Sequence, residues 1–151
     1  MAQGSKKRIL NLLKLISELH DIGKIAIDDS ILNKPGKLND KEWEVIKKHP
    51  EIGYRILSAT PEYSKIAQDI LSHHERYDGK GYPRGLKGDE IPVRAKIIAI
   101  ADAFDAMISD RPYRKAMTSS EAIEEIKRNT GTQFDPTVAK IFIDLFEEIA
   151  I

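Results

Sequence analysis

The sequence contains no cysteine, which excludes disulfide bonds, thiolate metal ligands and a cysteine nucleophile. Any metal ion must then be held by oxygen and nitrogen ligands. The N-terminal residues lack the apolar region and small-residue cleavage site of a secretory signal. No stretch reaches the roughly 18 consecutive apolar residues of a membrane span. These absences predict a soluble protein of the reducing cytoplasm.

No excess of one charge sign is present, because 24 lysines and arginines balance 24 aspartates and glutamates. Balanced charge creates no general attraction to nucleic acid or to an anionic membrane, so we expect neither as a partner. An anionic substrate would have to be bound by local groups. A chain of 151 residues with 41% hydrophobic content can form one domain with a core and is too short for two ordinary domains.

Internal repeats and strand-like alternation are also missing. Apolar residues instead recur at three- and four-residue steps, which predicts amphipathic helices. The predicted helices span residues 9–19, 39–49, 50–60, 61–72, 93–109, 120–128 and 136 to the C-terminus. Asn39 or Asp40 and Thr118 or Ser119 are the predicted helix caps. Residues 77–92 are rich in glycine and proline and predict a long loop, and such loops often carry function. The predicted class is all-α.

All four histidines sit in three short polar clusters, and a carboxylate lies in an apolar segment of residues 97–106. The residues are His20, Asp21, His49, His73, His74 and Asp102. A buried carboxylate must be paired, hydrogen-bonded or metal-bound. Nitrogen and oxygen donors of this kind suit a two-metal hydrolytic site. Their joint occurrence favours this interpretation.

Each cluster also has a plain structural explanation when it is taken alone. Asp21 could simply end the first helix with Gly23 as its cap, and His49 could be a surface residue. The two adjacent histidines could be one core residue and one exposed residue. Lys24 lies one turn after His20, where an ammonium could protonate a leaving oxygen. Asp105, one turn after Asp102, is a lesser candidate that could instead pair with a basic residue.

Eight separated motifs occur in order along the chain. They occupy residues 20–24, 32–38, 48–50, 73–83, 91–92, 101–106, 109–114 and 134–136. Together they resemble the HD-GYP domain, a branch of the HD phosphohydrolase superfamily that hydrolyses the bacterial messenger cyclic di-GMP. The resemblance covers the chain from about His20 to Phe146. It implies an all-α HD-superfamily bundle with a glycine-rich GYP loop, acting as a hydrolase in bacterial signalling.

The resemblance also implies roles for individual residues. The six residues of the metal set would hold divalent ions, iron or manganese, with Asp21 bridging two of them. Lys24 would assist departure of the 3′ oxygen. Arg111 and Arg114 would bind the non-reacting phosphate, although they could instead form surface pairs with Asp110 or Asp105. Asp105 is the remaining substrate-binding candidate. Tyr82 resembles a lip that contacts the ligand or a diguanylate cyclase partner.

One departure from the family pattern concerns the N-terminal side of the HD pair. The family carries a further histidine ligand upstream, and no histidine precedes His20 here. We therefore expect complete ligands for one ion, at Asp21, His49, His73 and His74. The second ion would be one protein ligand short and bind weakly. A module of low activity that binds nucleotide or a cyclase partner is the alternative function.

The predicted organisation is an N-terminal amphipathic helix over residues 1–19, followed by a catalytic core over residues 20–151. Residues 1–5 are polar and without pattern, as in a cloning remnant. The first helix has more apolar surface than one neighbour can cover. The face formed by Ile9, Leu12, Ile16 and Leu19 therefore predicts a homodimer.

Overall fold

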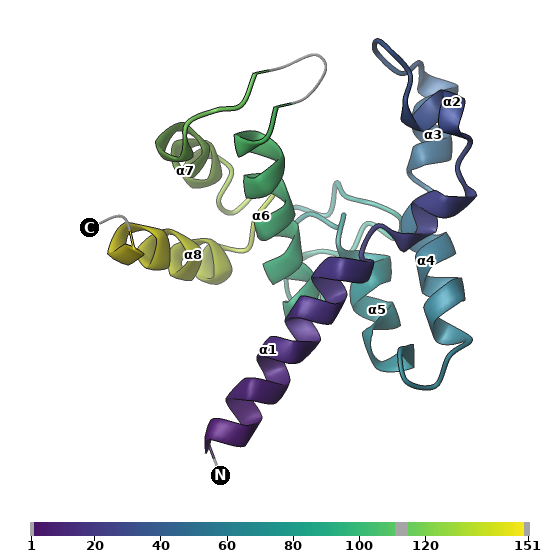
Figure 1. Ribbon diagram of the computed structural model, residues 1–151. Coiled ribbons are helices and arrows are strands. Elements are labelled where there is room, and N and C mark those ends of the chain that lie inside the picture. The colour runs from purple at the N-terminus through teal and green to yellow at the C-terminus, as the bar shows by residue number, and fades with distance from the viewer. Residues whose placement is uncertain (1, 111–114, 150–151) are drawn as a thin grey trace. The chain divides into compact units, whose positions relative to one another are not determined.

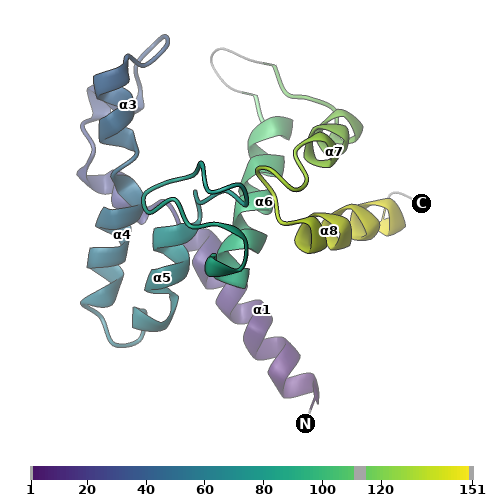
Figure 2. The ribbon, with the colours of Figure 1, turned by 180° about the vertical axis from the view of Figure 1, so that it is seen from behind.

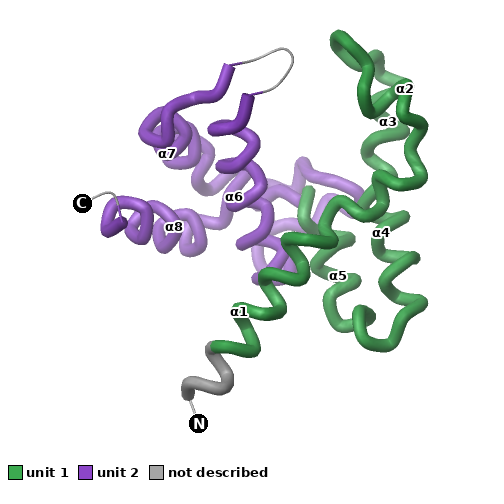
Figure 3. Tube along the Cα trace, in the orientation of Figure 1, with its two compact units in different colours: residues 1–74 green, residues 75–151 purple. Residues whose placement is uncertain are grey.

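The computed structural model describes residues 2–110 and 115–149, and side chains from residue 7 onward. The described residues form helices and loops without a strand, which confirms the all-α prediction. The chain divides into two compact units, residues 1–74 and residues 75–151 (Figure 3). None of the helices in the described part is both long and apolar enough to cross a membrane.

The first unit contains five α-helices and one 3₁₀-helix. These are α1 (Ala2–Leu19), η1 (Ile22–Ala26), α2 (Asp29–Leu32), α3 (Asp40–Ile46), α4 (His49–Ser58) and α5 (Ser64–Ser72). Helices α4 and α5 lie side by side and run in opposite directions, as Figures 1 and 2 show. Helix α1 packs on α5, and η1 packs on α4. His49 begins α4, and His73 and His74 directly follow α5.

A glycine allows η1 to approach α4 closely. A Cβ atom at Gly23 would lie 1.9 Å from the carbonyl oxygen of His49 and 2.7 Å from the backbone nitrogen of Gly53. Only a residue without a side chain fits at such a distance. Gly23 does not have a left-handed backbone, so it is not the helix cap that we considered as an alternative. Its role is to bring His20 and Asp21, which directly precede η1, next to His49.

Helix α1 only partly confirms the predicted apolar face. Ile16 is fully buried. The prediction that this residue belongs to an uncovered apolar face is therefore wrong. Ile9 remains 55% exposed and its neighbour Leu10 remains 56% exposed. Among the described side chains of the helix, Ile9 and Leu10 are therefore the large apolar residues left uncovered.

The second unit begins with a long loop and ends with three helices. The loop contains a short 3₁₀-helix, η2 (Gly88–Glu90), and the helices are α6 (Val93–Ile108), α7 (Ser119–Arg128) and α8 (Pro136–Ile149). The three helices pack on one another around a core that includes Ile100, Ile126 and Phe134. Phe104 of α6 contacts Phe142 of α8 with ring centroids 5.4 Å apart.

Candidate metal centre

Four side chains of the first unit converge on one point. Asp21, His49, His73 and His74 each offer one ligand atom, and these atoms all lie within 4.8 Å of one another. Asp21 directly precedes η1, His49 begins α4, and the histidine pair follows α5. Residues more than 50 positions apart are thus brought together by the α4–α5 pair and by the close approach of η1. His49 and His73 are each 1% exposed, which excludes a surface position for His49.

Backbone carbonyls fix the orientation of three imidazole rings. The Nδ1 atom of His49 lies 2.8 Å from the carbonyl of Ile46, and Nδ1 of His73 lies 2.6 Å from that of Ile70. His20 makes the same contact with the carbonyl of Ser17, at 2.7 Å. Because a carbonyl oxygen only accepts, Nδ1 must carry the proton in each ring. The lone pair of each Nε2 atom is then available to a metal ion.

The separation of two of these nitrogens fits a shared cation. The Nε2 atoms of His49 and His73 are 3.3 Å apart. With both protons on Nδ1, neither Nε2 atom can donate a hydrogen bond to the other, so two lone pairs face each other. Two nitrogen ligands at about 2.0–2.1 Å from one ion have a separation of this size when their bonds meet near a tetrahedral angle. The donors present therefore fit a divalent metal ion.

Burial keeps these histidines in the form that binds metals. Burial lowers the pKa of His49 below its ordinary value, and burial lowers the pKa of His73 to about 4. Both rings are thus neutral at pH 7. Neutral imidazole is the state required of a ligand, so no proton has to be displaced from Nε2 when a metal binds at neutral pH.

The two carboxylate oxygens of Asp21 face different partners. Oδ1 lies 3.3 Å from Nε2 of His49, whereas Oδ2 lies 3.5 Å from Nε2 of His20. The Nζ atom of Lys24 donates a hydrogen bond of 2.7 Å to Oδ2. Lys24 thus has its ammonium group at the edge of the cluster, where both its own side chain and that of Asp21 are 39% exposed.

The remaining predicted site residues belong to the second unit. Asp102 lies on α6 and is partly rather than fully buried, which differs from our expectation that its apolar neighbours would enclose it. Asp105 is exposed, and Tyr82 is partly buried in the glycine-rich loop. Arg111 and Arg114 lie outside the described residues. The roles assigned to these five residues stay predictions.

One residue of this loop has a clear structural role that the sequence did not reveal. Glu75 is only 4% exposed, and its two carboxylate oxygens accept hydrogen bonds from the backbone N–H groups of Arg84 and Leu86, at 2.8 and 2.9 Å. Glu75 belongs to the motif of residues 73–83, but the sequence pattern gave it no function. The available signal was a carboxylate beside the histidine pair that the metal set did not use.

Known proteins are similar to this chain in sequence or in fold. A "Cyclic di-GMP phosphodiesterase" of Thermotoga maritima is 46% identical over 148 residues, covering 97% of this chain and 40% of the relative. A "3′3′-cGAMP-specific phosphodiesterase 2" of Vibrio cholerae is 41% identical, covering 91% of this chain and 27% of the relative. The structure of Bd1817, described as a HDG"Y"P protein from Bdellovibrio bacteriovorus, matches with a TM-score of 0.68 and 20% identity, covering 90% of this chain and 43% of that chain.

The helical fold and the ligand cluster define a helical domain with a site that could hold a metal ion. The chain belongs to the HD domain family, whose model matches residues 2–138, and the predicted resemblance to the HD-GYP branch is confirmed. The chain spans less than half the length of the relatives named above.

Proposed function

We propose that this chain is the catalytic core of a metal-dependent phosphodiesterase that hydrolyses cyclic di-GMP to pGpG or GMP in bacterial second-messenger signalling. The observation that carries the proposal is the convergence of one carboxylate and three imidazoles beside an ammonium group, that of Lys24. Relatives with 46% and 47% identity are named cyclic di-GMP phosphodiesterases, which supports the same substrate class.

The proposed cofactor is a pair of divalent ions, iron or manganese. Bound ions of this kind activate water at neutral pH and neutralise charge on a phosphodiester. His49, His73, His74 and Oδ1 of Asp21 would hold the first ion. The orientation of Oδ2 toward His20 supports a bridging role for Asp21, with His20 and Asp102 completing a weaker second position.

Lys24 is the proposed proton donor to the leaving 3′ oxygen. Its ammonium group is held at 2.7 Å from Asp21, next to the ligands without being one of them. Arg111, Arg114, Asp105 and Tyr82 are the proposed substrate-binding residues. The arginines would contact the phosphate that does not react.

The glycine-rich loop is also proposed to dock a diguanylate cyclase partner through residues 79–83. The loop is tied at its base by the hydrogen bonds of Glu75 and by those of Asp78, whose side chain accepts from the backbone of Lys80 at 3.0 Å. A loop held in this way presents a defined surface. A module that only docks and does not hydrolyse is the alternative to the enzyme, and we place either one in the cytoplasm.

The test is turnover of cyclic di-GMP by protein purified without chelator and supplied with manganese or ferrous iron. We expect hydrolysis that stops when the metal is removed with a chelator and returns when it is added back. 3′3′-cGAMP is the second substrate to test, because relatives with 41% and 42% identity are named as specific for it. Preferential hydrolysis of 3′3′-cGAMP would reassign the substrate. If metal-loaded protein hydrolyses neither compound, the enzyme proposal is wrong and the docking module is the remaining function.

A further inference from the structure

The buried carboxylate of Glu75 closes the loop that carries Tyr82. Its two oxygens accept hydrogen bonds from two backbone N–H groups that are nine and eleven residues further along the chain, those of Arg84 and Leu86. Residues 75–86 thus form a closed ring, with Lys80 to Pro83 on the segment between the anchored points. Backbone N–H groups of a loop have no helical or strand partners, so a buried carboxylate that accepts from two of them is a strong local constraint.

Other contacts hold the base of this ring, where Asp78 pairs with Lys87 and the backbone N–H of Gly88 donates to the carbonyl of Tyr77. Arg76 forms hydrogen bonds to both carboxylate oxygens of Asp78, at 3.1 and 2.9 Å. The backbone N–H groups of Tyr77 and Asp78 donate to the carbonyls of Gln133 and Thr132. These bonds fix where the loop leaves the domain. The described hydrogen bonds to the backbone N–H groups of residues 84 and 86 are those made by Glu75.

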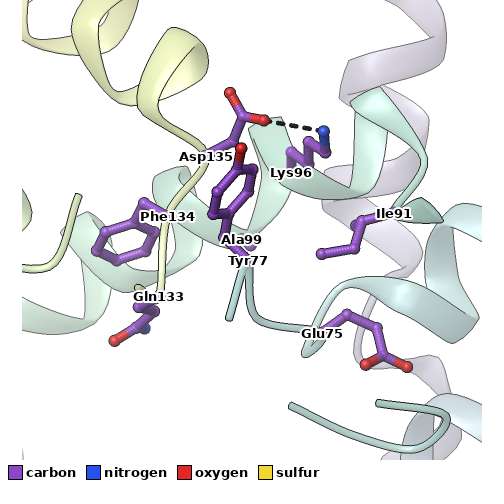
Figure 4. Close-up of a pocket in the computed structure, with 8 residues that line it drawn as sticks. All are labelled: Glu75, Tyr77, Ile91, Lys96, Ala99, Gln133, Phe134 and Asp135. Carbon is purple, nitrogen blue, oxygen red and sulfur yellow. Dashed lines mark hydrogen bonds and ion pairs between the residues drawn. The ribbon is translucent and has the colours of Figure 1, made fainter. Parts of the chain in front are cut away.

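A neighbouring pocket shows that Glu75 is not part of the other charged group nearby. Tyr77, Lys96 and Asp135 line the same pocket as Glu75, and Lys96 donates a hydrogen bond of 2.9 Å to Asp135. Figure 4 shows the carboxylate of Glu75 turned away from this pair. Glu75 therefore binds the backbone of the loop, while the bond between Lys96 and Asp135 joins α6 to the start of α8.

We propose that Glu75 is a positioning residue that sets the conformation of residues 80–83 and thereby the binding of substrate by Tyr82. In this role it acts through the backbone N–H groups of Arg84 and Leu86. The effect on substrate binding rests on the proposed phosphodiesterase function, whereas the effect on the loop does not. Two variants remove the support in different ways. Glu75→Gln replaces one acceptor oxygen by an NH₂ group, which cannot accept a hydrogen bond. Glu75→Asp keeps both acceptor oxygens on a side chain that is one methylene shorter.

The first measurement is hydrogen exchange at the amides of Arg84 and Leu86. We expect both amides to be protected in the wild-type protein and to exchange about tenfold faster or more in both variants, because each bond to a charged acceptor is lost or weakened. Asp89→Asn is the matched control. It removes a charge from the same loop at a fully exposed carboxylate, whose contact is with Lys96 at 3.5 Å, and it should leave both amides protected.

The second measurement is the steady-state kinetics of cyclic dinucleotide hydrolysis together with metal content. Both Glu75 variants should bind metal as the wild-type protein does and raise KM about tenfold or more, with a smaller effect on kcat. Equal KM values in an active protein, or lost metal in both variants, would overturn the positioning role. An inactive wild-type protein would refute the proposed function, and the exchange measurement would still decide the role of Glu75. If neither variant folds, rapid exchange of the two wild-type amides overturns the proposal.

Discussion

Three histidines of the chain are oriented by the same kind of hydrogen bond to a backbone carbonyl. His20, His49 and His73 each place Nδ1 against the carbonyl of the residue three positions earlier. This hydrogen bond follows from helix geometry, because the last carbonyls of a helix have no partner within it and lie close to a side chain that follows. It fixes the tautomer of each ring before any metal arrives. The ligand set is in this sense preorganised by local backbone structure.

Lys24→Ala should lower turnover of cyclic di-GMP by roughly 10²–10⁴-fold while leaving metal content and fold unchanged, because the ammonium acts on the leaving oxygen and is not a ligand. The control is Lys140→Ala. It removes an exposed lysine that forms a similar hydrogen bond of 2.6 Å, to Asp144. Turnover under saturating metal, with metal content measured on the same samples, decides the question. Unchanged turnover of the Lys24 variant would remove this residue from the mechanism.

Asp78 gives a prediction for the pH dependence of stability. Hydrogen bonds from Arg76 are the main cause that lowers the pKa of Asp78 to about 2. In the unfolded state the carboxyl group has its ordinary pKa of 3.8. Between this pKa and the folded pKa of about 2, the unfolded state binds more protons than the folded state. The stabilisation is therefore fully present above about pH 4 and is lost as the pH falls through 2.

Asp78→Asn should accordingly lower the free energy of unfolding by about 1 kcal/mol at pH 6, and by less as the pH approaches 2. Denaturant unfolding of both proteins across this pH range measures the difference. Arg76→Gln should remove the same pH dependence, since Arg76 is its main cause. A difference between wild type and Asp78→Asn that stays constant down to pH 2 would contradict the pairing.

At the scale of elements, the junction of η1 and α4 determines the ligand geometry. Gly23→Ala would place a methyl group against the His49 carbonyl, which belongs to a backbone and cannot move alone. We expect a loss of about 1–3 kcal/mol or more in the free energy of unfolding and a weaker hold on metal. Gly53→Ala is the control, because its Cβ would meet the Cγ2 methyl group of Ile70 at 3.0 Å and not a backbone atom at 1.9 Å, and it should cost less. Equal stability and metal content in wild type and Gly23→Ala would show that the close approach is not needed.

Helix boundaries could be predicted where a local signal decides them. Asn39 and Thr118 cap α3 and α7, each in a reciprocal arrangement with Glu42 or Glu121. The predicted caps are confirmed because the same side chain and backbone groups make the bond in any surrounding. The predicted boundary between the helices of residues 39–49 and 50–60 is also seen, since α3 ends at Ile46 and α4 begins at His49. The short elements η1 and α2 were not predicted, because too few residues are involved to show a period.

Features that depend on tertiary packing could not be read from the sequence. Asp21, His49, His73 and His74 were predicted as ligands from their residue types and motif, and the structure brings one ligand atom of each to within 4.8 Å of the others. The need for glycine at position 23 and the loop-closing role of Glu75 depend on contacts with distant segments. The burial of Ile16 also depends on packing, because an apolar face alone does not tell which part of it a neighbour covers.

At the scale of the whole molecule, the exposed apolar residues Ile9 and Leu10 of α1 predict self-association. Ile9 and Leu10 are each more than half exposed, and burial of such residues against a second copy would remove apolar surface from water. Sedimentation of the 151-residue protein should show a dimer whose fraction rises with concentration. Ile9→Lys should weaken this dimer, whereas Ile141→Lys, at an equally exposed position of α8, should not. A monomer at all concentrations would refute the prediction.

The central claim is that Asp21, His49, His73 and His74 hold a metal ion, and metal-soaked crystals measured by anomalous scattering test it most directly. We expect a fully occupied ion at these four residues. The proposed second ion, which would take His20, Asp21 and Asp102 as ligands, should be bound only partly, because a missing ligand commonly lowers affinity by about ten- to a hundredfold. Two fully occupied ions would show that no upstream histidine is needed. Absence of an ion beside His73 and His74 would contradict the account.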